Sequence, residues 1–268
     1  MDRQKVVIDN LKDSYGPMLD SVSRVAEIET GGVKHYNFIV FANTARKFPE
    51  YGTKYKVGWW MNDLRHPKDI GKINRKIDAV FLCNKQYLLD YESYYKIPTF
   101  YVPQCGLTPQ NKSGRKMEAP VVFIGSVLTN QYHANRWTII EHIKKEFDVD
   151  VIFGERNTSD QDHIYKNTPI SLAISPQAYG YTSNRLYNIL ASGGFCLTLY
   201  FPGIEDLFEN KKHLVWFKTK EEALELAKYY INNPKEIDKI AKQGHQEYLK
   251  KHTAKHRLDY MFNILETL

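Results

Sequence analysis

Short apolar runs alternate along the chain with longer segments in which apolar residues recur every three or four positions. The runs are rich in β-branched and aromatic residues, as buried strands are, and they lie at 5–9, 36–43, 54–63, 79–84, 99–106, 121–126, 149–154, 170–175, 195–200 and 213–217. The segments with helical spacing lie at 18–28, 68–77, 85–95, 132–147, 159–166, 185–192, 204–208, 220–232, 234–250 and 253–267. Strands that alternate with helices predict parallel sheets, and continuous apolar runs predict sheets covered on both faces. The pattern therefore predicts an α/β fold.

A polar stretch interrupts this alternation near the middle of the chain. Residues 108–120, TPQNKSGRKMEAP, contain proline, glycine and serine and show no periodicity, which is typical of a linker. About five strands are expected on either side of it, enough for one open sheet each. We therefore expect two Rossmann-like domains that face a cleft, with the boundary between residues 117 and 118.

The second half contains a polar loop that leads into an amphipathic helix, in the stretch YTSNRLYNILASGG that begins at Tyr181. Ser183 or Asn184, next to Thr182, is expected to cap the helix by accepting hydrogen bonds from its first N–H groups. The free backbone donors and the positive end of the helix dipole suit a phosphate group, and Arg185 in the first turn can hold phosphate oxygens with two nitrogens. The alternative is an ordinary capped helix with a solvated arginine, and both interpretations stay open at this point.

A second candidate for the same region is the turn Gly125-Ser126, which ends the strand VVFIGS. Glycine lets a ligand approach the backbone closely, and open α/β sheets bind ligands at the carboxyl ends of their strands. Arg136 lies in the helix that follows this turn. It either reaches into the same site as Arg185 or lies on the surface.

The strand 54–63 ends in polar residues at the carboxyl edge of the first predicted sheet. Asp63 is the last of them, and His66 follows shortly after. A carboxylate or an imidazole at this edge can act as a general base that deprotonates a hydroxyl group. Alternatively, Asp63 hydrogen-bonds the backbone of its own turn.

Several common catalytic motifs are missing from the sequence. There is no GxGxxG, no GxxxxGK[ST], no HExxH and no GxSxG, which disfavours dinucleotide-binding proteins, P-loop proteins, zinc proteases and α/β-hydrolases. Asp148 and Asp150 form a DxD pair, which holds a divalent cation in some sugar transferases. Here the pair comes before the strand and not after it, so it is expected at the edge of the sheet opposite the ligand site. We therefore expect no metal site.

Composition and charge indicate which binding partners and which cellular compartment suit the protein. The formal net charge of +6 suits an anionic partner such as a nucleotide, a nucleic acid or an acidic membrane surface, although ordinary solubility explains it equally well. The three cysteines, Cys83, Cys105 and Cys196, show no metal-binding spacing and indicate buried thiols in a reducing compartment. No transmembrane segment or signal peptide is visible, so we expect a cytoplasmic protein.

The second half resembles the C-terminal domain of GT-B-fold glycosyltransferases, most closely the spore-maturation-protein type of the broad group 1 sugar transferases. The blocks that carry this resemblance are RLYNILASGGFCLTLYFPGIEDLF from Arg185, the acidic helix start Glu221-Glu222, Tyr229-Tyr230 with Asn233-Pro234, and His252-Thr253. The VVFIGS turn and Arg136 also match. The resemblance covers about residues 120–260 well and 36–106 only loosely, by the tryptophan-containing strand that ends at Asp63 and by the segment VPQCG.

The resemblance implies a donor domain at 118–252, an acceptor domain at 1–117 and a last helix at 253–268 that packs back on the acceptor domain. It implies a nucleotide-sugar donor, for which we predict a UDP-sugar, and no cofactor besides this substrate. Gly125, Ser126 and the helix that starts near Arg185 hold the diphosphate in this scheme. Asn188 replaces a glutamate that often binds the donor ribose in the family, and it approaches the ribose here without a charge.

We therefore predict a metal-independent glycosyltransferase that moves a sugar to an acceptor hydroxyl group. Asp63 is the preferred general base and His66 the second. The acceptor is a glycan, a small molecule or modified DNA, because the sequence does not distinguish them. One alternative is a glycosyltransferase that acts on hydroxymethylated bases of DNA, and another is a non-catalytic module that binds nucleotide sugars.

Overall fold

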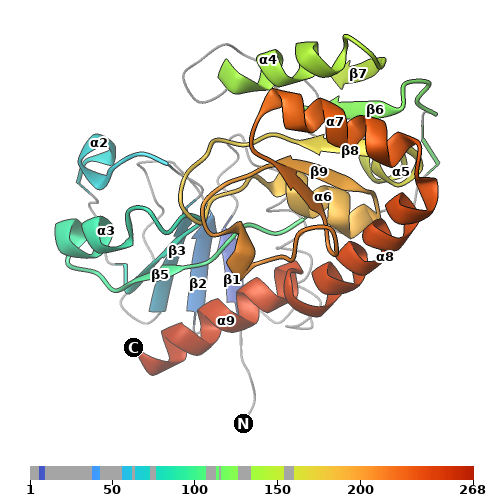
Figure 1. Ribbon diagram of the computed structural model, residues 1–268. Helices are drawn as coiled ribbons and strands as arrows, with labels where there is room; N and C mark the ends of the chain where they lie inside the picture. Colours follow the sequence, from blue (N-terminus) through green and yellow to red (C-terminus); the bar gives the residue numbers. More distant parts are fainter. Residues whose placement is uncertain are drawn as a thin grey trace. The chain divides into compact units, whose positions relative to one another are not determined.

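The computed structural model of the chain describes residues 6–9, 38–42, 56–61, 64–72, 77–106, 113–114, 116–125, 134–153 and 160–268 (Figure 1). Its contacts divide into two compact units. The first consists of Met1–Cys105, Ala178–Gly180 and Ala254–Leu268, and the second of Gly106–Gln177 and Tyr181–Thr253.

The first unit contains a five-stranded parallel sheet whose strands lie side by side in sequence order. The strands are β1 (Val6–Asp9), β2 (Phe38–Ala42), β3 (Lys56–Met61), β4 (Ala79–Leu82) and β5 (Thr99–Tyr101). The helices described in this unit are α2 (Pro67–Ile70), α3 (Leu88–Tyr95) and α9 (Ala254–Thr267).

Helices cover both faces of the central strands of this sheet. On one face Trp59 of β3 and Tyr91 of α3 belong to the same buried cluster. On the other face Gly58 of β3 leaves room for the ring of Phe81 and for Leu265 of α9, since a methyl group at Gly58 would lie 2.6 Å from that ring and 3.2 Å from Leu265. The last helix therefore packs against β3 in the first unit, as the resemblance implied.

The second unit contains another five-stranded parallel sheet, in the order β10-β9-β8-β6-β7. The strands are β6 (Val121–Ile124), β7 (Val149–Ile152), β8 (Ile170–Ala173), β9 (Cys196–Leu199) and β10 (Val215–Phe217). The helices are α4 (Ala134–Ile143), α5 (Gln161–Asn167), α6 (Asn184–Ser192), α7 (Lys220–Ile231) and α8 (Pro234–Lys251), with a short 3₁₀ turn η1 (Ile204–Asp206).

Alternate residues of β6 enter two separate cores. Val121 and Phe123 pack with α4 and α7, which lie side by side in Figure 1. Val122 and Ile124 pack on the opposite face with α5 and α6. The sheet is therefore covered on both faces, which explains why its strands are continuous apolar runs.

The predicted α/β class and the parallel sheets are confirmed, whereas several predicted boundaries were too wide. The strand expected at 99–106 ends at Tyr101, because Pro103 has no N–H group to continue a ladder. The helix expected at 68–77 is the short α2, which ends at Gly71 with a φ of 85°. The helix expected at 18–28 lies outside the described residues.

Candidate functional site

The strand order of the second sheet reverses between β6 and β8. The chain passes from β6 to β7 on one side and then returns to form β8 on the other side of β6. In open α/β sheets the loops that leave such a pair of strands diverge, and the space at their carboxyl ends is where ligands bind. Gly125 follows β6 and Ile174 follows β8 at this point. The described strands of the first sheet show no such reversal.

The side chain of Arg185 spans this reversal point. Its Nε donates to the carbonyl oxygen of Ile124 over 2.6 Å, and its Nη1 donates to that of Ile174 over 3.1 Å. The guanidinium carbon lies 4.4 Å from the centre of the Phe123 ring. Because Arg185 is only 9% exposed, these contacts fix a nearly buried cation between the ends of β6 and β8.

Arg136 reaches the same place from α4. Its Nε donates to the carbonyl oxygen of Ile174 over 2.8 Å, and its guanidinium carbon lies 5.9 Å from the centre of the Phe123 ring. It is 5% exposed. The structure thus brings together the two arginines that the sequence proposed for one site. Of the two alternatives for Arg136, it excludes the one on the surface.

Gly125 makes the close approach of Arg185 possible. Its φ is 146°, and a methyl group built there would lie 2.2 Å from Nη2 of Arg185. Any larger residue would strain the backbone and displace the guanidinium group. Glycine at this position therefore serves the packing of the Arg185 side chain, whereas the prediction concerned the approach of a ligand.

The two arginines place two positive charges close together at buried positions. Burial, and then the charge of Arg185, lower the pKa of Arg136 to about 9. Burial also lowers the pKa of Arg185. Within the part of the chain that the structure describes, Arg185 pairs with no carboxylate; its polar contacts are carbonyl oxygens. Buried cations of this kind favour an anionic ligand.

Ser183 occupies the N-cap position of α6, but its side chain does not cap the helix. Its hydroxyl group hydrogen-bonds the hydroxyl of Ser175 over 2.9 Å, and its N–H donates to the same Ser175 oxygen over 3.2 Å. Of the two predicted capping residues, Ser183 and Asn184, Ser183 holds the N-cap position, but its side chain makes no capping hydrogen bond because its hydroxyl group is bound to that of Ser175. The start of α6 keeps backbone donors that no side-chain cap occupies.

The remaining residues of the loop lie around the same helix start. The Thr182 side chain is 2% exposed, and its hydroxyl oxygen has no hydrogen-bond partner among the residues that the structure describes. Tyr181 is close enough to influence the pKa of both Arg136 and Arg185. A buried hydroxyl group without a partner is costly, and a ligand that hydrogen-bonds it removes that cost.

Asn188 lies one turn after Asn184 on α6, so both are on one face of the helix. It is buried, and its backbone carbonyl accepts a hydrogen bond from the hydroxyl of Ser192 over 2.8 Å. An uncharged amide at a buried position avoids the desolvation cost that a carboxylate would carry.

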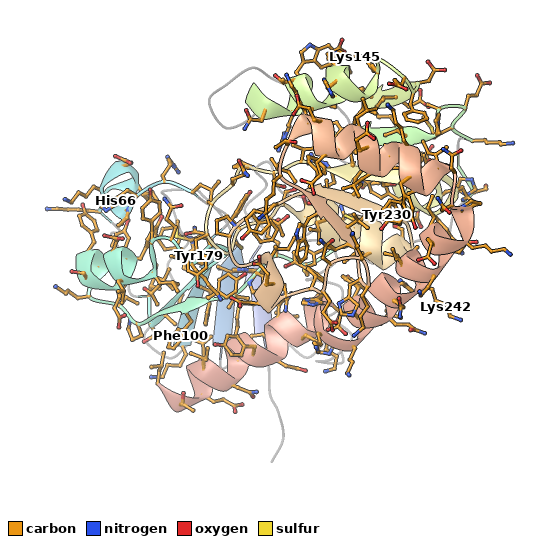
Figure 2. The ribbon with its side chains drawn as sticks, in the orientation of Figure 1. His66, Phe100, Lys145, Tyr179, Tyr230 and Lys242 are labelled. Carbon is orange, nitrogen blue, oxygen red and sulfur yellow. The ribbon has the colours of Figure 1, made fainter. Side chains whose placement is uncertain are left out.

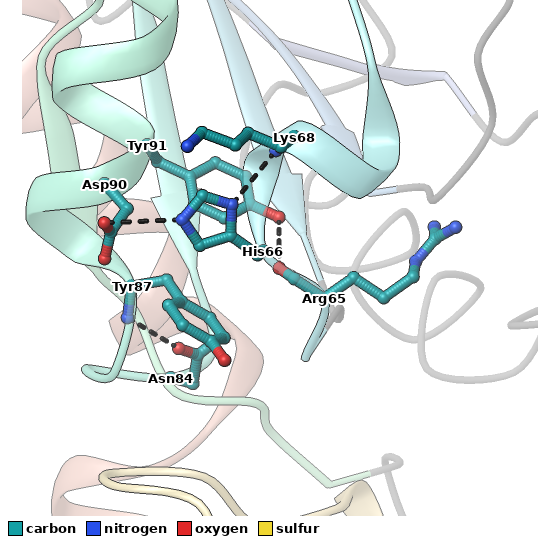
Figure 3. A network of polar contacts seen from close by, with 7 residues as sticks. All are labelled: Arg65, His66, Lys68, Asn84, Tyr87, Asp90 and Tyr91. Atoms are coloured by element: carbon teal, nitrogen blue, oxygen red, sulfur yellow. Dashed lines mark hydrogen bonds and ion pairs between the residues drawn. The ribbon is translucent and has the colours of Figure 1, made fainter.

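In the first unit His66 caps α2 and contacts an acidic residue (Figure 3). Its Nδ1 accepts a hydrogen bond from the N–H of Lys68 over 3.2 Å. Its Nε2 lies 3.4 Å from Oδ1 of Asp90, and its ring packs edge-on against Tyr87. Both ring nitrogens are engaged in these contacts, and His66 forms the N-cap of α2.

Two of the predicted site residues, Asp63 and Ser126, lie outside the described residues. The DxD pair is at the amino end of β7, where Asp150 accepts a hydrogen bond from the N–H of Ala119 over 3.4 Å. Among the residues placed by the structure, no three histidine, cysteine or acidic side chains form a group that could hold a metal ion. Nor does that part of the chain contain a helix long and apolar enough to cross a membrane.

The sequence did not reveal the acceptors that orient the arginines. Both are carbonyl oxygens, of Ile124 and Ile174, and a backbone carbonyl leaves no trace in the sequence. Ser175 was also missed. Its position directly after an apolar strand, at the same sheet edge as Gly125, is a signal that could have found it.

Comparison with known proteins relates this geometry to a family. Residues 116–263 match the family described as glycosyl transferase-like. The chain belongs to this glycosyl transferase-like family. Comparison with curated proteins gives no match.

Solved structures of glycosyltransferases have a similar fold. HepE of Anabaena, solved with UDP and glucose, aligns with a TM-score of 0.63 at 11% identity, over 96% of this chain and 84% of that one. A glycosyltransferase of Rickettsia africae aligns with a TM-score of 0.60 at 10% identity, over 97% and 83%. A variant of TarM from S. aureus, in complex with fondaparinux, alpha-GlcNAc-glycerol and UDP, aligns with a TM-score of 0.61 at 11% identity, over 85% and 55%. The chain thus spans about half the length of TarM, and at these identities the likeness concerns the fold.

Proposed function

We propose that this protein transfers a sugar from a UDP-sugar to an acceptor hydroxyl group. The observation that carries the proposal is the pair Arg136 and Arg185, two buried cations bound to one carbonyl oxygen at the reversal point of the second sheet. A diphosphate supplies the negative charge that such a pair favours. The family and the UDP bound in the HepE and TarM structures support this choice of donor.

In the proposed complex the diphosphate lies against the start of α6. Nη2 of Arg185 and the backbone N–H groups of Asn184 and Arg185 face its oxygens, and the Thr182 hydroxyl group gains a partner. Gly125 and Ser126 line the opposite side. Asn188, one turn further along α6, approaches the ribose hydroxyl groups. A helix N-terminus combined with arginine is a recurrent phosphate site.

The same groups provide a reason to propose transfer without a metal ion. When the bond between sugar and diphosphate breaks, negative charge develops on the departing phosphate oxygen. Fixed donors and cations that point at this oxygen stabilise the transition state more than the ground state. Arg136, Arg185 and the N-terminus of α6 take this role in our proposal.

The acceptor is proposed to bind the first unit, in the GT-B arrangement of two domains on either side of a cleft, with the acceptor domain at 1–117 and the donor domain at 118–252. Asp63 is the proposed general base that takes the proton of the acceptor hydroxyl group, and His66 is the second candidate. Asparagine can replace His66 as an N-cap. His66→Asn therefore separates the two roles, since a capping residue tolerates this change and a base does not.

The first experiment is a thermal-shift panel of nucleotide sugars and their nucleoside diphosphates. A ligand at about a hundred times its Kd should stabilise the native protein by about 2.7 kcal/mol. The nucleotide sugar that stabilises it most is then tested for transfer and for hydrolysis, with and without EDTA. Stabilisation by UDP compounds that disappears in Arg185→Met supports the donor site, and no stabilisation by any member of the panel refutes it.

Two other functions make different predictions in the same assays. Asn188, in place of the glutamate frequent in the family, favours a module that binds nucleotide sugars without catalysis. Binding without turnover, unchanged in Asp63→Asn, would establish that alternative. The net charge of +6 favours modified DNA as the acceptor. In that case acceptor binding weakens steeply with salt, because phosphate contacts release counterions.

A further inference from the structure

Gln161, the first residue of α5, carries a buried amide group that is only partly hydrogen-bonded. Its side chain is 7% exposed, and its Nε2 donates to the hydroxyl oxygen of Tyr165 over 3.0 Å. Among the residues that the structure describes, none hydrogen-bonds its Oε1. An amide oxygen buried without a partner costs free energy, so a ligand that donates a hydrogen bond to it gains affinity.

Tyr165, one turn further along α5, fixes the direction of this amide. Its ring is completely buried in the core that α5 and α6 share, and burial raises the pKa of its hydroxyl group to about 12. The hydroxyl group is therefore neutral and accepts the hydrogen bond from Nε2 of Gln161. Because the amide nitrogen is held in this way, the amide oxygen is the atom left for a ligand.

The two helices pack together within the second unit, on the face of the sheet opposite α7, whose Tyr230 is labelled in Figure 2. Gly194, just after α6, permits this packing, since a methyl group there would lie 2.3 Å from the carbonyl oxygen of Tyr165. Tyr165 and Arg185 are close enough that each influences the pKa of the other. The Gln161 amide is thus held near the proposed diphosphate site by packing inside one unit.

The path of the chain places Gln161 over the carboxyl end of β6. The helix α5 connects β7 with β8 and crosses β6 on the way, so Tyr165 packs in one cluster with Ile124 of β6. The carbonyl oxygen of Ile124 is also an acceptor for Arg185. A helix between parallel strands runs opposite to them, so its first residue lies at the carboxyl edge of the sheet, where the ligand is proposed to bind.

We propose that Gln161 recognises the base of the nucleotide donor and selects a base with a ring N–H group, such as uracil. The inference rests on the proposed donor site and goes beyond it, because it names the residue that chooses the nucleotide. N3 of uracil carries a hydrogen that Oε1 can accept, whereas N3 of cytosine is itself an acceptor. Cytosine would place two acceptors against each other and leave Oε1 unpaired, and a site built around a hydrogen bond rejects such an analogue strongly.

The test compares the Kd of CDP with that of UDP by calorimetry in the wild type and in Gln161→Met, whose side chain has a similar length and no amide. We expect CDP to bind at least about tenfold more weakly than UDP in the wild type, and the two Kd values to differ by less than about twofold in Gln161→Met. Thr168→Val is the control, because Thr168 lies at the opposite end of α5, where its hydroxyl group donates to the carbonyl oxygen of Ile164. It should keep the wild-type ratio.

Tyr165→Phe tests the direction of the amide. It keeps the ring in the core and removes the hydroxyl group that holds Nε2, so the amide can turn its nitrogen toward N3 of cytosine. The affinity for CDP should therefore rise relative to that for UDP. The wild-type ratio in Gln161→Met overturns the inference, and so does the wild-type ratio in Tyr165→Phe.

Arg185→Lys separates this inference from the proposed function. UDP and CDP carry the same diphosphate, so both should lose affinity by the same factor and their ratio should not change. If the wild type binds UDP and CDP equally well, the inference fails and the donor site stands. If the wild type binds neither nucleotide, the proposed donor site fails and the inference fails with it.

Discussion

Arg136 and Arg185 donate hydrogen bonds to one and the same acceptor, the carbonyl oxygen of Ile174, over 2.8 and 3.1 Å. The two side chains come from α4 and α6 and lie over one ring, that of Phe123. Like charges held this close repel each other, and the repulsion contributes to the lowered pKa of Arg136. Two cations held side by side suit an anionic ligand, as in the proposed donor site.

Arg185→Lys should weaken UDP binding although the charge is retained. The guanidinium group bridges the carbonyl oxygens of Ile124 and Ile174 with two nitrogens, and an ammonium group cannot reproduce this geometry. We expect a Kd for UDP about tenfold higher, by calorimetry. Arg257→Lys is the control, because Arg257 is equally buried but donates to the carbonyl oxygen of Gln104 in the first unit. An unchanged Kd in Arg185→Lys, or the same loss in both variants, would contradict the assignment.

Gly125→Ala should lose UDP affinity out of proportion to its loss of stability. The added methyl group lies 2.2 Å from Nη2 of Arg185 and must displace it. Gly71→Ala is the matched control, since Gly71 also has a positive φ, 85°, but has nothing within 4 Å of a methyl group. In both variants an alanine with a positive φ strains the backbone by about 1 kcal/mol or more. Only Gly125→Ala also displaces the guanidinium group of Arg185. Melting temperatures and Kd values measured side by side distinguish the two effects.

The affinity for UDP should fall as the pH rises above about 9, the pKa of Arg136 in the free protein. Only the protonated guanidinium group attracts the diphosphate, so the bound anion raises this pKa and binding is favoured below it. The ratio of wild-type to Arg136→Gln affinity should be constant at pH 7 to 8 and decline above pH 9. Taking this ratio cancels the ionisation of the ligand itself. A ratio that stays constant and well above one up to pH 10 would show that Arg136 keeps its charge there, whereas a ratio near one at every pH would refute its role.

The same pKa has a consequence for stability with a defined sign. The folded-state pKa of Arg136 is lowered by burial from its ordinary value to about 9, so above pH 9 the unfolded chain binds more protons than the native one. The contribution of Arg136 to the free energy of unfolding therefore rises with pH above about 9. Denaturant unfolding at pH 8 and pH 10 measures the free energy of unfolding of the wild type and of Arg136→Gln. From pH 8 to pH 10 the wild type should gain stability relative to the variant. A relative loss of stability at pH 10 would contradict the prediction.

The sequence indicated the candidate site through features that are local. The glycine after β6, the polar loop before α6 and the apolar strands are all visible within short windows, because turns, caps and buried strands select residue types directly. The order of the strands in the second sheet is not local. It decides that Gly125 and Ile174 are neighbours, and it emerged only with the pairing of β6 and β8.

The prediction for Ser183 failed for the same reason. A serine before a helix is the preferred N-cap, and Ser183 does occupy that position. Its hydroxyl group instead meets Ser175, which tertiary packing brings to the other end of the loop. The preference of serine for the N-cap therefore predicts the position of Ser183 correctly but not the hydrogen bond that its hydroxyl group makes.

Thr182→Val should weaken UDP binding without destabilising the free protein. The Thr182 hydroxyl group is buried, and no described residue hydrogen-bonds it. An apolar group of the same shape therefore removes an unpaired oxygen and is expected to be neutral or stabilising by up to about 1 kcal/mol. The ligand, however, loses a hydrogen bond. Thr168→Val provides the opposite case, because the buried Thr168 hydroxyl group donates to the carbonyl oxygen of Ile164 over 2.8 Å. It should lower the free energy of unfolding by about 1 kcal/mol and leave the Kd of UDP unchanged, so a similar result for both variants would show that Thr182 does not face the ligand.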